Sequence, residues 1–115
     1  MNIKSWLNRG RTVDNVIHVL ESDRGILKSQ SLEKKLEDKK RKLFELKEEI
    51  YSVIEKVDDD KYFLVLYGRY ILMKSWEEIA HENHYSLRHT FRLHGEALNK
   101  VKSIKSNGNI EKYQK

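Results

Sequence analysis

Residues 75–98, SWEEIAHENHYSLRHTFRLHGEAL, contain two helix starts in quick succession. The first, Ser75-Trp76-Glu77-Glu78, is a capping-box sequence, in which a serine and a glutamate three residues later satisfy each other's free helix N–H groups. Ser86 is a second residue of a type favoured at N-caps, and a longer amphipathic run follows it. Two capped helices joined by a turn of a few residues predict a helix-turn-helix unit.

The second predicted helix carries cations near its beginning, the part that enters the major groove of double-stranded DNA in this motif. Arginine is suited to bidentate contact with guanine. The N–H groups at the start of the first helix, and the lysine before it, are predicted to approach a phosphate, because a helix N-terminus favours an anion. The candidate DNA-contacting residues are Lys74, Ser75, Ser86, Arg88, His89 and Arg92.

The composition predicts a mostly helical protein of one domain, or of one domain with an appended helical arm. The 115 residues include no proline, no cysteine and five glycines. The absence of cysteine excludes disulfides and thiolate metal sites, which fits a reducing compartment. No apolar run approaches the ~20 residues that span a bilayer, so we expect no membrane partner and a cytoplasmic location.

The positive charge is concentrated in the C-terminal half. The formal net charge of the chain is +5. Residues 31–60 hold eight Lys/Arg and ten Asp/Glu, whereas residues 61–105 hold eight and four. The excess therefore lies in the segment with the two predicted helix starts. A basic balance favours polyanions through phosphate contacts and counterion release.

The N-terminal part is predicted to form a helical hairpin. Residues 2–21 show a helical apolar stripe, and Gly25 is expected to end that helix. Residues 29–57 repeat apolar residues over roughly four heptads, which predicts a coiled-coil arm. Part of this seam is left for the C-terminal helices or for a homodimer. The seam consists of Leu36, Leu43, Ile50 and Val57, with Leu32, Leu46 and Val53 at its other position.

The remaining elements complete the expected order. Asp58-Asp59-Asp60 offers an N-cap for a third helix over 60–73, whose aromatic stripe is interpreted as core. The last helix is expected to extend to about Ile104 and to be terminated by Ser106-Asn107-Gly108-Asn109. We therefore predict an arm over 1–57, a helix-turn-helix unit over 58–105 and a flexible tail over 106–115.

Two blocks of this sequence resemble a known family. The blocks are Lys74-Ser75-Trp76-Glu77-Glu78-Ile79-Ala80 and Arg92-Leu93-His94-Gly95-Glu96-Ala97-Leu98, with Tyr85-Ser86 and Arg88-His89 between them. The chain resembles small phage and prophage proteins with a sigma-factor region-four-like helix-turn-helix. This resemblance implies an all-α fold, an arm followed by a three-helix unit, and a DNA-binding regulator of the late-gene activator type. The arm would provide dimerisation or contact with RNA polymerase.

The chain departs from the family pattern at the turn and in the second helix. Asn83 and His84 stand where the family has an apolar residue and a glycine, and Thr90 stands where it has a β-branched apolar residue. We expect Asn83 to adopt a left-handed conformation and Thr90 to bond back to a carbonyl of its own helix. Leu87 and Phe91 fall where DNA-facing side chains would lie.

These departures motivate a second hypothesis, in which the fold binds and inhibits a host protein such as RNA polymerase or a defence nuclease. A third hypothesis is a structural adaptor that works through residues 29–57 alone. Enzymatic activity and cofactors are not expected, because no nucleophile elbow or phosphate-binding glycine loop is present. No metal is expected either, since His81 and His84 do not have the HExxH spacing.

Overall fold

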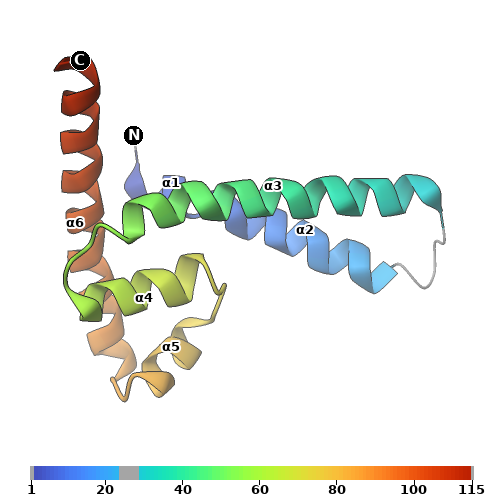
Figure 1. Cartoon of the computed structure of the whole chain (residues 1–115). Coiled ribbons are helices and arrows are strands. Elements are labelled where there is room, and N and C mark those ends of the chain that lie inside the picture. The colour runs from blue at the N-terminus through green and yellow to red at the C-terminus, as the bar shows by residue number, and fades with distance from the viewer. Residues whose placement is uncertain (1, 24–28, 115) are drawn as a thin grey trace.

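The computed structural model describes residues 2–23 and 29–114, with residues 23 and 108–114 described by their backbone alone. These residues form helices and no strands, so the predicted all-α fold class is confirmed. The helices are α1 (Ile3–Leu7), α2 (Arg9–Asp23), α3 (Gln30–Ile54), α4 (Asp60–Tyr70), α5 (Trp76–Glu82) and α6 (Leu87–Gln114). The molecule is flat, with extents of 47 × 43 × 19 Å, and the long helices α3 and α6 run crosswise (Figure 1).

The first predicted helix, 2–21, is two helices that meet at Asn8. Asn2 caps α1 by accepting from the Ser5 N–H at 3.0 Å. Trp6 and Leu7 of α1 are buried in the main core, and α1 contacts α6 while α2 follows α3. A single straight helix could not reach both neighbours, because its apolar stripe would face one direction only.

Helices α2 and α3 form the predicted hairpin (Figure 1). Ser29 caps α3 through the Leu32 N–H at 3.1 Å. The seam residues Leu36, Leu46 and Ile50 are buried within the chain. The seam is therefore occupied by the protein's own helices. The predicted helix end at Gly25 lies outside the described residues.

The main core lies where α1, α3, α4 and α6 meet, so it crosses the predicted boundary between residues 57 and 58. Its buried members are Trp6, Leu7, Ile50, Ile54, Val57, Leu66, Tyr70, Ala97 and Val101. A smaller cluster joins Val65 of α4, Ile79 of α5 and Leu93 of α6. A Cβ added at Gly68 would lie 3.2 Å from Ile79 Cγ1, so glycine permits the close approach of α4 and α5. The arm and the C-terminal helices are thus held by one shared core.

Helix α4 ends at Tyr70, three residues before its predicted end. Met73 adopts a left-handed conformation with φ of 58°, and the N–H groups of Leu72 and Lys74 return to the carbonyls of Tyr67 and Gly68. Such returning bonds are a common way to end a helix. This turn sets the direction in which α5 begins.

Helix α6 continues to Gln114, so the predicted stop at Ser106–Asn109 is wrong, and 106–114 is helical where a tail was expected. Serine, asparagine and glycine each cost at most about 1 kcal/mol relative to alanine inside a helix, and no proline blocks the backbone. In the described part of the chain, no helix is both long and apolar enough to cross a bilayer.

Candidate nucleic-acid interface

The start of α6 is fixed by hydrogen bonds from Ser86. Its Oγ accepts from the His89 N–H at 3.0 Å. Its carbonyl accepts from both the N–H and the hydroxyl of Thr90, each at 3.0 Å. Thr90 is fully buried, so its hydroxyl bonds back to its own helix while its methyl packs inside, as predicted. The first turn of α6 is therefore set by its own side chains.

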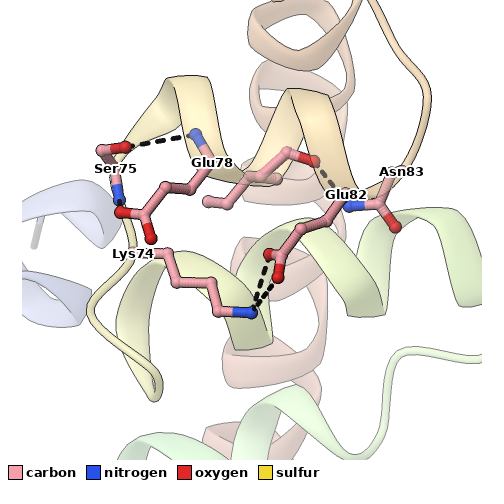
Figure 2. A network of polar contacts seen from close by, with 6 residues as sticks. Lys74, Ser75, Glu78, Glu82 and Asn83 are labelled. Carbon is pink, nitrogen blue, oxygen red and sulfur yellow. Dashed lines mark hydrogen bonds and ion pairs between the residues drawn. The ribbon is translucent and has the colours of Figure 1, made fainter.

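The turn before α6 uses His84, where the sequence pointed to Asn83. His84 has φ of 59°, whereas Asn83 has φ of −98°. The Asn83 side-chain amide instead donates to the Ile79 carbonyl at 2.8 Å (Figure 2). The prediction of a left-handed Asn83 is wrong by one residue, because asparagine is used to satisfy the end of α5 and the exposed His84 takes the conformation that glycine favours.

Four predicted DNA-contacting residues come together on the first two turns of α6. Ser86, Arg88, His89 and Arg92 line one shallow surface depression of about 330 Å³. Arg92 Nη2 lies 2.9 Å from His89 Nδ1, and the His89 ring stands edge-on to Tyr85 at a centroid distance of 4.8 Å. Arg88 and Arg92 are exposed, and neither has an ion-pair partner among the described residues.

The other two predicted residues, Lys74 and Ser75, are engaged within the protein (Figure 2). Lys74 Nζ lies 2.7 and 2.8 Å from the two carboxylate oxygens of Glu82. Ser75 forms a complete capping box with Glu78: its N–H donates to Glu78 Oε1 and its Oγ accepts from the Glu78 N–H. These hydrogen bonds lower the pKa of the Glu78 carboxyl. The Ser75 N–H at the start of α5 is therefore already bonded to the Glu78 carboxylate.

Apolar side chains accompany the arginines on the exposed face of α6. Leu87 is 39% exposed and Phe91 is 47% exposed. The Phe91 ring packs edge-on against Trp76 at 5.3 Å, and the Arg69 guanidinium lies over the same indole at 4.3 Å. Trp76 is thus a packing residue.

Gly95, two turns after Arg88, lies on the exposed side of α6. A Cβ added there would meet nothing within 4 Å. Gly95 therefore does not serve to bring α6 close to another helix. Gly95 follows Leu93 and His94 directly in the block Arg92–Leu98. Because successive residues of a helix point in different directions, Gly95 faces outward while Leu93 and His94 are buried.

A buried pair on the opposite side of α6 holds the helix in place. Tyr70 Oη lies 2.6 Å from His94 Nε2, and the Trp76 ring contacts the His94 ring edge-on at 4.6 Å. Burial raises the pKa of the Tyr70 hydroxyl to about 12 and lowers the pKa of the His94 imidazole to about 4. His94 is therefore a neutral core residue at physiological pH. In the sequence, His94 stands out only as part of a family-like block, because its partner Tyr70 lies 24 positions earlier.

Several cations elsewhere in the described chain are paired with a carboxylate. Arg9 pairs with Glu49 at 3.0 Å, Lys40 with Glu21 at 3.2 Å, and Arg41 with Asp38 at 3.3 Å. The start of α6 differs, since its first turn contains no acidic residue. A helix N-terminus carries partial positive charge, so this end adds to the field of the two arginines. Within the described ranges, no three His, Asp or Glu side chains could together hold a metal ion.

Comparisons of the chain with protein-family models, with curated proteins and with solved structures find no match.

Proposed function

We propose that this protein is a sequence-specific DNA-binding regulator of phage or prophage transcription. In this proposal α4, α5 and α6 act as a helix-turn-helix unit, and the first two turns of α6 enter the major groove of double-stranded DNA. The observation that carries the proposal is the exposed pair Arg88 and Arg92, one helical turn apart and without a carboxylate partner in the described part of the chain.

The side chains that line the depression at the start of α6 are of types that bind DNA. Arginine presents a planar fork of donors that matches the O6 and N7 acceptors of guanine. Ser86 and His89 add hydrogen-bonding groups at the same place. The helix start carries no acidic residue that would repel a phosphate. Interfaces of this kind bind mostly through phosphate contacts and discriminate through a few base contacts.

The sequence resemblance supplies the regulatory context. The block Lys74–Ala80 and the block Arg92–Leu98 resemble those of sigma-region-four-like phage regulators. A protein of that type acts at a promoter beside RNA polymerase, and here the helical hairpin of α2 and α3 would be the element that reaches polymerase or a second copy.

Lys74 and Ser75 have a different part in the proposal from the one that sequence alone suggested. A phosphate would have to compete with Glu82 for Lys74 and with Glu78 for the Ser75 N–H. We infer that these residues orient α5, and that Ser86, Arg88, His89 and Arg92 make the DNA contacts.

The experiment is selection of bound sequences from random double-stranded DNA, followed by affinity measurement on the selected site. Replacing Arg88 and Arg92 together with alanine removes two contacts of about 1–3 kcal/mol each and should weaken specific binding by about 30-fold or more. The matched control is Lys100→Ala/Lys102→Ala, which removes the same charge from exposed positions farther along α6. Failure to enrich any motif with wild type, or equal affinity of the arginine variant, contradicts the proposal.

A second candidate function is favoured by the exposure of Leu87 and Phe91 on the same face. Solvent-exposed apolar side chains beside cations also suit a protein partner, such as a host RNA polymerase or a defence nuclease. This function predicts that a partner captured from host lysate stays bound after nuclease treatment and at high salt, and is lost in Leu87→Ser/Phe91→Ser. DNA binding that persists in this apolar variant, with no retained partner, favours the first function.

A further inference from the structure

The outer face of α3 carries exposed aromatic side chains that the chain itself covers only in part. Phe44 is 63% exposed, and Tyr51 is 39% exposed two turns later on the same face. With Tyr67 of α4 and Ile71, the residue after that helix, they line an apolar groove of about 290 Å³. The Tyr51 and Tyr67 rings meet edge-on at 6.0 Å, so one wall of the groove is built by packed aromatics.

This face is separate from the heptad seam of the same helix. Leu36, Leu46 and Ile50 of the seam are buried by the protein's own helices, so the seam is not available to a second copy. The face is also separate from the arginines at the start of α6. An interface on the outer face of α3 would therefore be independent of DNA binding.

The residues along this face form a pattern that is complementary to itself. At 3.6 residues per turn, six of them lie within about 50° of one line along the helix. Placed against an antiparallel copy, Phe44 faces the partner's Tyr51, Lys47 faces the partner's Glu48, and Lys40 faces the partner's Glu55. Each pairing occurs twice about a two-fold axis between residues 47 and 48. The six residues, in order, are Lys40, Phe44, Lys47, Glu48, Tyr51 and Glu55.

We propose that a second copy of this chain docks antiparallel on the outer face of α3 and forms a symmetric dimer. A two-fold interface uses the same patch on both subunits, which requires a self-complementary pattern of this kind. The face has two lysines and two glutamates, so it has no net charge to attract nucleic acid. Lys40 already pairs with Glu21 at 3.2 Å, and its ammonium group has three donors with which to contact the partner's Glu55 as well.

The test exchanges the charges of Lys47 and Glu48 and measures the dissociation constant of the dimer by sedimentation equilibrium of the purified full chain. Wild type should sediment as a dimer, with twice the chain mass of 13.8 kDa, at tens of micromolar protein. Lys47→Glu puts two glutamates opposite each other on both sides of the axis and should raise the dissociation constant about tenfold. Lys47→Glu/Glu48→Lys recreates both opposite-charge pairs and should return the constant to near that of wild type.

An apolar variant and its matched control locate the interface. Phe44→Ser should give a monomer, whereas Val19→Ser on α2, where the replaced side chain is 60% exposed, should leave the dimer intact. Circular dichroism checks that each variant is folded. A monomeric wild type overturns the proposal. So does a charge exchange that fails to restore association, or a Val19→Ser variant that dissociates as readily as Phe44→Ser.

Discussion

Helices α5 and α6 both begin at a serine cap, yet the two helix starts leave very different surfaces. At α5, Ser75 and Glu78 satisfy each other, and Glu82 neutralises Lys74 at 2.7 Å. At α6, Ser86 satisfies the His89 N–H, and the exposed cations Arg88 and Arg92 have no carboxylate partner in the described chain. The difference follows from the first turn, which contains two glutamates in α5 and no acidic residue in α6. The positive groups at the start of α5 are neutralised by the protein's own carboxylates, whereas the arginines at the start of α6 are available to an anion.

The surface at the start of α6 depends on this helix being held in a fixed position, and the buried His94 helps to hold it. The largest expected effect is therefore the dependence of the free energy of unfolding on the protonation of His94. The pKa of His94 is lowered to about 4 in the folded chain, below its ordinary value of 6.5. Between pH 4 and pH 6.5 the unfolded chain binds a proton at His94 that the folded chain does not bind. The free energy of unfolding therefore has its full value above pH 6.5 and decreases as the pH is lowered toward 4. We expect a loss of about 2 kcal/mol between pH 7.5 and pH 5, measured by urea unfolding.

The control for this prediction is His94→Gln, which removes the titrating group. The variant should be less stable at pH 7.5 and should lose most of its pH dependence over the same range. Equal pH dependence in wild type and His94→Gln would show that another group is responsible.

A smaller effect separates the two caps. Ser75→Ala and Ser86→Ala should each destabilise the protein by about 1 kcal/mol, because each leaves helix N–H groups without a partner. Only Ser86→Ala should also weaken DNA binding, when the affinities are measured under conditions in which both variants are fully folded. Ser103→Ala, at an exposed position within α6, is the stability control. If Ser75→Ala impaired DNA binding as much as Ser86→Ala, the two helix starts would not differ in function.

The smallest effect concerns the turn between the two helices. His84 has φ of 59°, a conformation that costs a residue with a side chain roughly 1 kcal/mol relative to glycine. His84→Gly should therefore stabilise the protein by up to about 1 kcal/mol in urea unfolding and should leave the affinity for DNA unchanged. Asn83→Gly removes the bond to the Ile79 carbonyl and should destabilise. A His84→Gly variant that is less stable than wild type would contradict the backbone conformation of this turn.

Much of the fold could be predicted from sequence because its determinants are local. The capping box at Ser75–Glu78, the buried seam of α3 and the back-bonding of Thr90 all depend on residues within a few positions of one another. The all-α class follows from these periodic segments. The helix break at Asn8 was not predicted, because it depends on where α6 lies relative to α1.

The candidate site could be predicted only in part, for a similar reason. Ser86, Arg88, His89 and Arg92 share one helix face, so their meeting follows from the helical period. The pairing of Lys74 with Glu82 depends on the left-handed Met73 and the direction it gives to the chain. The outward position of Gly95 follows from how α6 packs on α4 and α5, which no short motif encodes.

The most direct test of the central claim is the salt dependence of DNA binding. Each phosphate contact by a cation releases counterions, so the logarithm of the association constant falls with the logarithm of salt concentration by about 0.9 per contact. Because each of the two arginines is proposed to neutralise a backbone phosphate as well as to contact guanine, we predict that Arg88→Ala/Arg92→Ala makes this slope shallower by up to about 2. Lys74→Ala should leave the slope unchanged, because Glu82 already neutralises Lys74. An unchanged slope in the arginine variant, or an equal loss in Lys74→Ala, would contradict the assignment of the DNA-binding surface to the start of α6.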